Sequence, residues 1–238
     1  MTDERPLLPH ETATIGAGDY RWFADGRPLP ITEHWQILRA ASGYLFETVT
    51  DASAASEFRH HYRAILSLDA DARTTGLAMT VTKGELTVEV AVHLAADGAV
   101  ITRARTNIAE GAVQRTQTFR MEEGATLEAH PVLFDGLHIA ACDRAMTGPY
   151  RRPCLWLDLL TDDAQGLMAA RPTVYVIDRR ETMSGETYAF TRWGNDLEMA
   201  ESLISVKTVG RWIVPTELRF TMAGVLYSVY LVNEQWEE

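Results

Sequence analysis

The chain has few cysteines and few basic side chains for its length of 238 residues. Its two cysteines, Cys142 and Cys154, match no metal-binding spacing and indicate a reduced compartment rather than a disulfide-stabilised domain. Only 22 Lys and Arg residues stand against 33 Asp and Glu residues, so the formal net charge is −11. A surface of this sign repels phosphate backbones and anionic lipid headgroups, and nucleic acid is therefore not expected as a partner.

Long apolar runs and metal-binding motifs are also missing. No segment approaches the roughly 20 consecutive apolar residues that a membrane-spanning helix needs. The first 17 residues lack the apolar core of a leader peptide, so we expect a cytoplasmic protein that does not span a membrane. The seven histidines form no His-x-His pair and no His-Glu-x-x-His motif, and therefore neither a metal nor a cofactor is expected.

Glycine recurs at nearly constant intervals in the middle of the chain. Gly84, Gly98, Gly111 and Gly124 stand 14, 13 and 13 residues apart, and apolar and polar residues alternate between them. Alternation is the period of a β-strand and glycine favours tight turns, so this stretch predicts consecutive hairpins. Similar turn signals return at residues 184–185, 194–195, 209–210 and 223–224. Most of the chain is therefore predicted to be one long antiparallel meander.

Turn lengths predict which residues of neighbouring strands lie opposite each other. A two-residue turn at Lys83-Gly84 sets Met79 opposite Val88, so both strands present apolar residues to one side. A four-residue turn in the last hairpin likewise pairs Leu218 with Tyr227. These pairings place the apolar residues of successive strands on a common face.

Four arginines in the same region look at first like an anion site: Arg103, Arg105, Arg115 and Arg120. A three-residue turn at 96–98 directs Arg103 and Arg105 away from the core and sets Glu89 across from Arg105. Cross-strand charge pairs on a solvated face explain these two residues. Arg115 is the exception, because its predicted direction is the core face.

Residues 131–145 break the alternation. Leu133 and Leu137 recur at helical spacing and Pro131 precedes them, which predicts one short helix between two sets of strands. One stripe of this helix carries Asp135, His138 and Cys142. The stripe fits either an ordinary half-exposed helix face or a Cys–His nucleophile.

The predicted fold is mainly β. About a dozen meandering strands cannot stay in a flat open sheet, because their right-handed twist curls them. We therefore expect a long antiparallel meander curled into an open or half barrel, with the short helix at about 131–145 between two strand sets. Residues 1–17 are expected to be a flexible N-terminal arm, and residues 18–238 a single barrel-like domain.

The segment 212–218, Trp-Ile-Val-Pro-Thr-Glu-Leu, lies near the C-terminal end of this meander. Together with the twisted meander and its single helical stretch, it resembles an uncharacterised bacterial family of open β-barrels. That family looks like the lipoprotein-localisation factors, which hold acyl chains inside an unclosed barrel. The resemblance implies a barrel-like fold whose concave face suits a hydrophobic or amphipathic small molecule.

Ionisable residues on predicted apolar faces are the candidate functional residues. His60 shares such a face with Tyr62, and Asp158 shares another with Trp156. A carboxylate on an apolar face must find a donor, raise its pKa or line a cavity. Asp158 is therefore a candidate for a role beyond packing.

Glu201 is the most discordant residue, because a two-residue turn at 209–210 sets it opposite Leu218. If the sheet curls around its apolar face, the candidate side chains converge on one pocket. Separate structural hydrogen bonds for each of them are the alternative. The candidate ligand-binding residues are His60, Tyr62, Trp156, Asp158, Glu201 and Tyr227.

The sequence leaves three functions open. The first is binding of a hydrophobic or amphipathic small molecule in the concave face. The second is a structural role in which a sheet edge or the outer face forms a homodimer. The third is a hydrolase or isomerase in which Glu201 or Asp158 acts with His60 as an acid and base pair.

Overall fold

A computed structural model of the chain has 15 strands and one helix in the residues that it describes. Those residues are 12–55, 60–95, 98–107, 111–120, 125–129, 131–140, 149–162, 168–182, 185–194 and 197–237. The predicted mainly β fold with one helix is confirmed. Within the described residues, no helix has the length and apolar character needed to cross a membrane.

The strands form two sets on either side of the helix α1, Val132–Ala140. The first set comprises β1 (Ala13–Ala24), β2 (Arg27–Ala40), β3 (Gly43–Asp51), β4 (His61–Leu68), β5 (Thr74–Lys83), β6 (Leu86–Ala95), β7 (Gly98–Asn107), β8 (Gly111–Arg120) and β9 (Thr126–Glu128). The second set comprises β10 (Tyr150–Asp162), β11 (Met168–Thr182), β12 (Gly185–Gly194), β13 (Leu197–Val209), β14 (Trp212–Met222) and β15 (Val225–Trp236). β1 begins at Ala13, so residues 13–17, which were expected in the arm, belong to the sheet.

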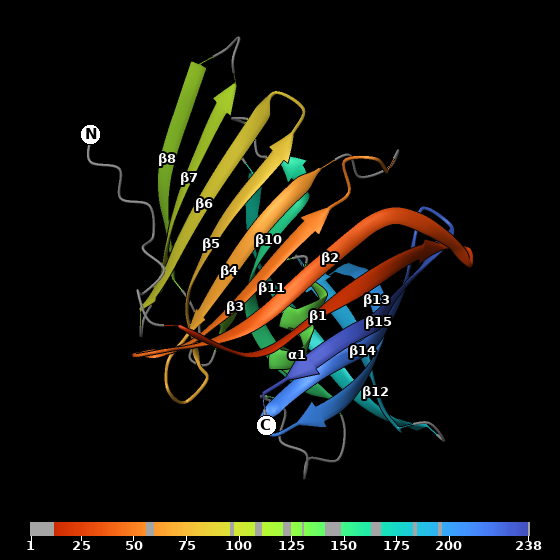
Figure 1. Ribbon diagram of the computed structural model, residues 1–238. Helices are drawn as coiled ribbons and strands as arrows, with labels where there is room; N and C mark the ends of the chain where they lie inside the picture. The colour runs from red at the N-terminus through yellow and green to blue at the C-terminus, as the bar shows by residue number, and fades with distance from the viewer. Residues whose placement is uncertain are drawn as a thin grey trace.

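All strands belong to one sheet, in which the first strand of the chain pairs with the last (Figure 1). From β1 the order runs through β2 to β8 on one side and from β15 back to β9 on the other. Neighbouring strands are antiparallel except β9 and β10, which are parallel. This topology places β8 and β9 at the two edges of the sheet.

The sheet curls without closing into a barrel. Within the described residues β8 and β9 do not pair, and β9 instead lies close to β5. The hydroxyl oxygens of Thr74 on β5 and Thr126 on β9 are 3.4 Å apart. Strands β6, β7 and β8 therefore extend beyond the seam between β5 and β9. The predicted open barrel is confirmed.

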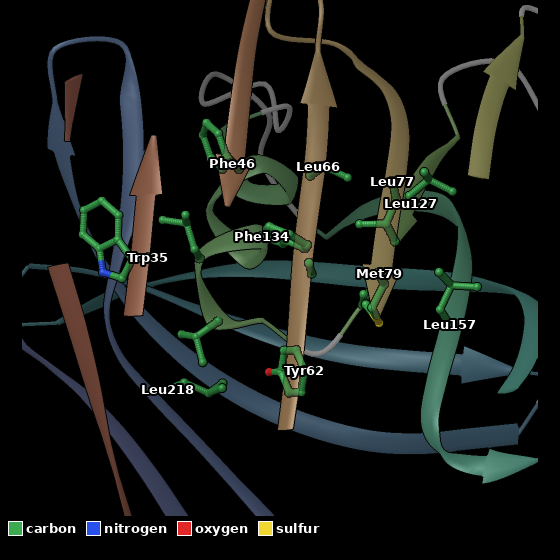
Figure 2. Packing of buried hydrophobic residues seen from close by; sticks show 14 of the residues in the cluster. Trp35, Phe46, Tyr62, Leu66, Leu77, Met79, Leu127, Phe134, Leu157 and Leu218 are labelled. Atoms are coloured by element: carbon green, nitrogen blue, oxygen red, sulfur yellow. The ribbon is translucent and has the colours of Figure 1, made fainter. Parts of the chain in front are cut away.

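Helix α1 lies inside the curl and packs mainly against β14 (Figure 1). Gly136 allows this close approach, because a Cβ at that position would lie 2.0 Å from the carbonyl oxygen of Ile213. Phe134 projects from α1 among buried side chains of several strands, as Figure 2 shows. The helix begins at Val132, close to the predicted start, whereas residues 141–145 of the predicted helix lie outside the described residues.

In two hairpins the side chains lie on the predicted side of the sheet, but they lie opposite other residues than predicted. The turn after β5 consists of Gly84 and Glu85, so Met79 lies opposite Val90 and not Val88. In the last hairpin Leu218 lies opposite Val229 and not Tyr227. Each pairing is displaced by two residues, and a displacement of two keeps every side chain on its predicted side of the sheet.

The hairpin of β6 and β7 is different, and its predicted pairing is wrong. Ala95 pairs with Gly98, so two residues rather than three connect the strands. A change of one residue exchanges the two faces of a strand. Arg105 therefore lies opposite Val88 rather than Glu89, and Arg103 is buried with an exposed fraction of 1%. These two arginines belong to the inner face of the sheet and not to its solvated face.

Candidate functional site

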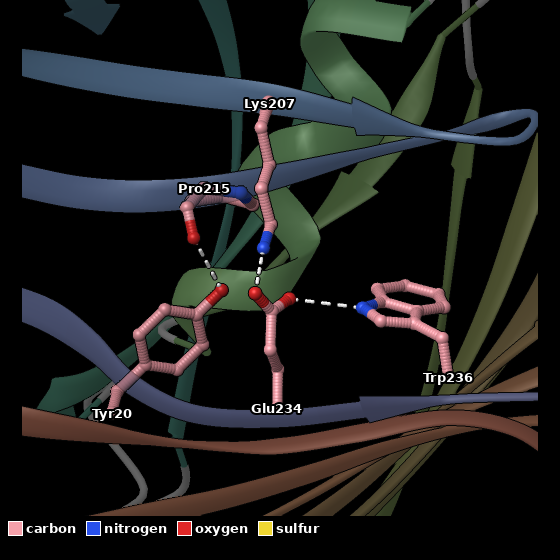
Figure 3. A network of polar contacts seen from close by, with 5 residues as sticks. All are labelled: Tyr20, Lys207, Pro215, Glu234 and Trp236. Atoms are coloured by element: carbon pink, nitrogen blue, oxygen red, sulfur yellow. Dashed lines mark hydrogen bonds and ion pairs between the residues drawn. The ribbon is translucent and has the colours of Figure 1, made fainter.

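A row of buried polar side chains crosses the inner face of four adjacent strands. Tyr62 on β4 lies opposite Thr50 on β3, Thr50 lies opposite Glu33 on β2, and Glu33 lies opposite Tyr20 on β1. All four residues are buried. The Tyr20 hydroxyl donates a 2.9 Å hydrogen bond to the carbonyl oxygen of Pro215 on β14 (Figure 3). The row thereby connects strands from both ends of the chain.

Glu33 caps the N-terminus of α1 from across the barrel. The backbone N–H of Val132 donates a 2.9 Å hydrogen bond to Glu33 Oε1, and the N–H of Leu133 and the Thr50 hydroxyl also favour its charged form. Burial outweighs these contacts and, with a contribution from the charge of Asp135, raises the pKa of Glu33 to about 8. Glu33 is therefore mostly a neutral acid at pH 7.

A second buried polar contact, between His138 and Glu128, lies at the C-terminal half of the helix. His138 on α1 contacts the carboxylate of Glu128 on β9 through Nε2. Burial and the nearby Arg152 lower the pKa of His138 to about 3, so its imidazole is neutral. Burial and the charge of Glu128 raise the pKa of Asp135 well above its usual range. His138 therefore anchors the helix to β9, while Cys142 lies outside the described residues.

The predicted residues His60, Tyr62 and Tyr227 are buried at one end of the inner face. The His60 ring stacks on Tyr62 with a centroid distance of 5.4 Å. Tyr227 stacks on Phe220 at 5.2 Å, and Phe220 meets the edge of Trp22 at 6.2 Å. This aromatic end of the barrel is the part of the predicted site that the structure describes in side-chain detail.

The remaining predicted residues lie on the strands of the second set. Trp156 is buried on β10, and the backbones of Asp158 and Glu201 belong to β10 and β13. The side chains of these two acids are outside the described residues. The predicted pairing of Glu201 with Leu218 is wrong: the turn lies at Gly210 and Arg211, and Thr216 is an extra residue that forms a bulge in β14, so Leu218 lies opposite Ile204.

The other end of the inner face carries aromatic and charged side chains near the C-terminus. Glu234 lies between the ammonium group of Lys207 and the indole N–H of Trp236, whose Nε1 is 2.9 Å from the carboxylate (Figure 3). The Trp236 ring covers Gly16, where a Cβ would lie only 2.4 Å from the indole. Trp35 packs beside Trp236 with ring centroids 5.7 Å apart. Protein side chains therefore pack against one another at this end of the barrel.

A pocket of about 350 Å³ lies on the outer face, across the neighbouring strands β15, β1, β2 and β3. Several of its polar groups already bind one another: Asp19 pairs with His34, and Glu47 accepts a 2.5 Å hydrogen bond from Gln36 Nε2. The lining residues are Ala17, Gly18, Asp19, His34, Trp35, Gln36, Glu47, Val49, Asn233, Glu234 and Gln235. The described residues contain no group of three or more His, Cys, Asp or Glu side chains arranged to hold a metal ion.

Sequence reasoning missed Glu33 and the outer pocket. Glu33 alternates with Ile31 and Trp35, so it had the same signal, a carboxylate on an apolar strand face, as Asp158. The pocket had no such signal, because it exists only where the first strand meets the last.

One solved structure has a similar fold over nearly the whole chain. It is a β-barrel-like protein of a domain of unknown function, DUF1849, from Brucella abortus, with a TM-score of 0.60 and 10% sequence identity. The match covers 94% of this chain and 98% of the other. It supports the expected likeness to an uncharacterised bacterial β-barrel-like protein, but not the likeness to lipoprotein-localisation factors. No family model and no curated protein matches the sequence.

Proposed function

We propose that this protein binds a hydrophobic or amphipathic small molecule on the concave face of its unclosed sheet. The observation that supports the proposal is a row of inner-face residues in direct register. Val113 on β8 lies opposite Arg105, Arg105 opposite Val88, Val88 opposite Val81, and Val81 opposite Tyr62. The row leads from the open edge of the sheet to the aromatic end of the barrel.

Exposure falls steeply along this row. Val113 is 36% exposed, Val88 is 4% exposed and Tyr62 is 1% exposed. An apolar surface that continues from solvent into a packed interior is the kind of surface on which apolar ligands bind. The centre of the barrel is less suitable, because α1 and its buried side chains fill it. The ligand is therefore proposed to enter along β8 and to extend toward Tyr62 and His60.

The proposal is tested with a neutral fluorescent probe, N-phenyl-1-naphthylamine, and two matched variants. Val113→Asp places a charge on the inner wall, and we expect about tenfold weaker probe binding, because a carboxylate must then be desolvated beside the ligand. Val100→Asp is the control, because Val100 lies on the neighbouring strand with a similar exposure of 40% but alternates with the inner residue Ile101. Val100→Asp is expected to leave probe binding unchanged.

Native mass spectrometry of the purified wild-type protein gives a second measurement, because a retained ligand appears as an added mass. Wild-type protein that binds no probe and carries no added mass would overturn the proposal. Equal loss of probe binding in both variants would also overturn it, since the effect would then not depend on the inner wall. Circular dichroism of both variants checks that the sheet is intact.

A further inference from the structure

The pocket on the outer face has a short side chain of β1 between longer polar ones. Ala17 lies opposite Gln235 on β15 and opposite Gln36 on β2, and all three residues line the pocket. The small alanine side chain contributes to a hollow of about 350 Å³ on this face. Small-molecule sites in proteins have volumes of about 300–1,000 Å³, so the hollow is large enough for a small ligand.

Hydrogen bonds to two carboxylates orient the side-chain amides of the pocket. Gln36 Nε2 donates a 2.5 Å hydrogen bond to Glu47, and Asn233 Nδ2 donates a 2.9 Å hydrogen bond to Asp19. An amide that donates through its nitrogen keeps its carbonyl oxygen as an acceptor for another group. Within the described residues no hydrogen bond engages either of these two oxygens. The pocket therefore offers two oriented acceptors.

His34 adds a third acceptor to the same pocket. Its Nδ1 contacts the Asp19 carboxylate, and 63% of its side chain is exposed. When Nδ1 carries the proton that Asp19 accepts, the neutral imidazole keeps Nε2 as an acceptor. Desolvation of the Asp19 carboxyl is outweighed by hydrogen bonds from Asn233 and His34, which lower its pKa. Asp19 is therefore charged at neutral pH.

The outward side chains of the pocket carry charge of one sign. Asp19 and Glu47 are acids, and none of the lining residues is Lys or Arg. Arg63 reaches Glu47 from outside the lining and forms an ion pair with it. In the part of the chain that the structure describes, Asp19 has no such ion pair with a Lys or Arg, because its partners are a histidine and an amide.

We infer that this pocket binds a small organic cation that carries a primary ammonium group. An ammonium has three N–H donors and no acceptor, which matches oriented acceptors beside the Asp19 carboxylate. The net charge of −11 also attracts cations to the chain and repels anions. The pocket lies on the opposite face of the sheet from the apolar row of β8, so the inference does not depend on the proposed function.

Three ligands with four-carbon chains and different end groups test the inference. Titration calorimetry compares 1,4-diaminobutane, 1,4-butanediol and succinate at pH 7 and physiological salt. The diamine is expected to bind about tenfold or more tightly than the diol, because hydrogen bonds between charged groups are stronger than those of neutral ones. Succinate is expected to show no binding, because its carboxylates are repelled by those of the pocket.

A pair of charge-removing variants locates the binding. Asp19→Asn is expected to weaken binding of the diamine about tenfold and to leave binding of the diol unchanged. Glu89→Gln is the matched control, because it removes the same charge from an exposed position on the outer face of β6, opposite Ala104. It is expected to change neither affinity. Thermal unfolding checks that each variant folds.

A second pair of variants tests the hollow itself. Ala17→Leu fills the space between the glutamines and is expected to abolish binding of the diamine. Ala78→Leu is the control, because Ala78 is also a half-buried alanine of the outer face but lies on β5, opposite Ala91 and away from the pocket. It is expected to leave binding unchanged.

Each other outcome has a definite meaning. Equal affinities for the diamine and the diol would overturn the inference, since the pocket would then not recognise charge. Equal losses in Asp19→Asn and Glu89→Gln would also overturn it, because net charge alone would explain the attraction. Retained binding in Ala17→Leu, or no binding of the diamine to the wild-type protein, would overturn it as well and leave the proposed function in place. Displacement of N-phenyl-1-naphthylamine by the diamine would contradict the assignment to a separate site.

Discussion

The inner face of this sheet has two regions that treat charge in opposite ways. Around α1, the buried side chains of Glu33 and His138 are mostly neutral at pH 7, because burial raises the pKa of Glu33 to about 8 and lowers that of His138 to about 3. On β7 and β8, the ionisable groups are arginines, and their exposure increases toward the edge of the sheet. The first region supports the fold, and the second is where we propose that a ligand binds.

The difference follows from the chemistry of the side chains. A buried carboxyl or imidazole can become neutral, so it can serve as a structural contact inside the barrel. A guanidinium stays charged in proteins, and it must keep solvent or an anionic partner nearby. The region around α1 therefore accommodates neutral polar side chains, whereas β7 and β8 carry charged ones. The strands of both regions show the same alternation of inward and outward residues.

The largest expected effect separates the two regions by packing. Phe134→Ala removes a fully buried ring from α1 and should lower the free energy of unfolding by about 3–5 kcal/mol. Phe119→Ala removes a half-buried ring from β8 and should cost about 1 kcal/mol. Urea unfolding measures both. If the two variants were equally destabilised, the helix-filled region would not be the stability centre of the protein.

A second prediction concerns the contact between α1 and β14. Alanine is a better helix former than glycine by about 1 kcal/mol, so propensity alone would make Gly136→Ala stabilising. The added methyl group would instead meet the Ile213 carbonyl oxygen, and we expect a net loss of about 2 kcal/mol or more. Ala140→Gly, at an exposed position of the same helix, should lose only about 0.5–1 kcal/mol. Stabilisation by Gly136→Ala would mean that α1 is not pressed against β14.

The smallest expected effect, taken per pH unit, is a pH dependence that belongs to the helix-filled region. Folding raises the pKa of Glu33 from 4.5 to about 8, so between these values the folded state binds more protons than the unfolded state. The contribution of Glu33 is full below pH 4.5 and is lost as the pH rises to about 8, with a slope of at most about 1.4 kcal/mol per pH unit. Glu33→Gln should remove this slope.

Asp19→Asn is the control for that measurement. Hydrogen bonds from Asn233 and His34 outweigh desolvation and lower the pKa of Asp19 from 3.8, so its contribution to stability changes only below about pH 4. Urea unfolding at several pH values between 4.5 and 8 should therefore show the wild-type slope in Asp19→Asn. An unchanged slope in Glu33→Gln would show that Glu33 does not carry a proton into the folded state.

The success of the sequence-based predictions depended on whether the pairing of neighbouring strands was displaced by an odd or an even number of residues. At Gly84 the predicted pairing was displaced by two residues, so Met79 and Val88 still share the predicted face. At 96–97 one residue too many was assigned to the turn, and Arg103 moved from the predicted solvated face to the core. Local turn signals do not determine a turn to within one residue, because several turn types accept the same residues.

The candidate site was predictable only in part. Strand alternation correctly placed His60 and Tyr62 on one buried face. It could not show that Glu33 meets the first turn of α1, because these residues are about a hundred positions apart in the chain and the contact depends on where the helix enters the barrel. The pairing of Arg103 with Arg115 depends on a different turn, the one between β7 and β8, where Asn107 lies opposite Gly111.

The sequence by itself determined that the chain forms a meander of alternating strands with one helical interruption, because strand and helix periods are local properties of neighbouring residues. Tertiary structure alone decided that β1 pairs with β15, that the sheet curls until β9 reaches β5, and that α1 fills only part of the concave face. These features depend on contacts between distant residues and on sheet twist accumulated over many strands. The same accumulation leaves the arginine-bearing wall of β7 and β8 beyond the seam.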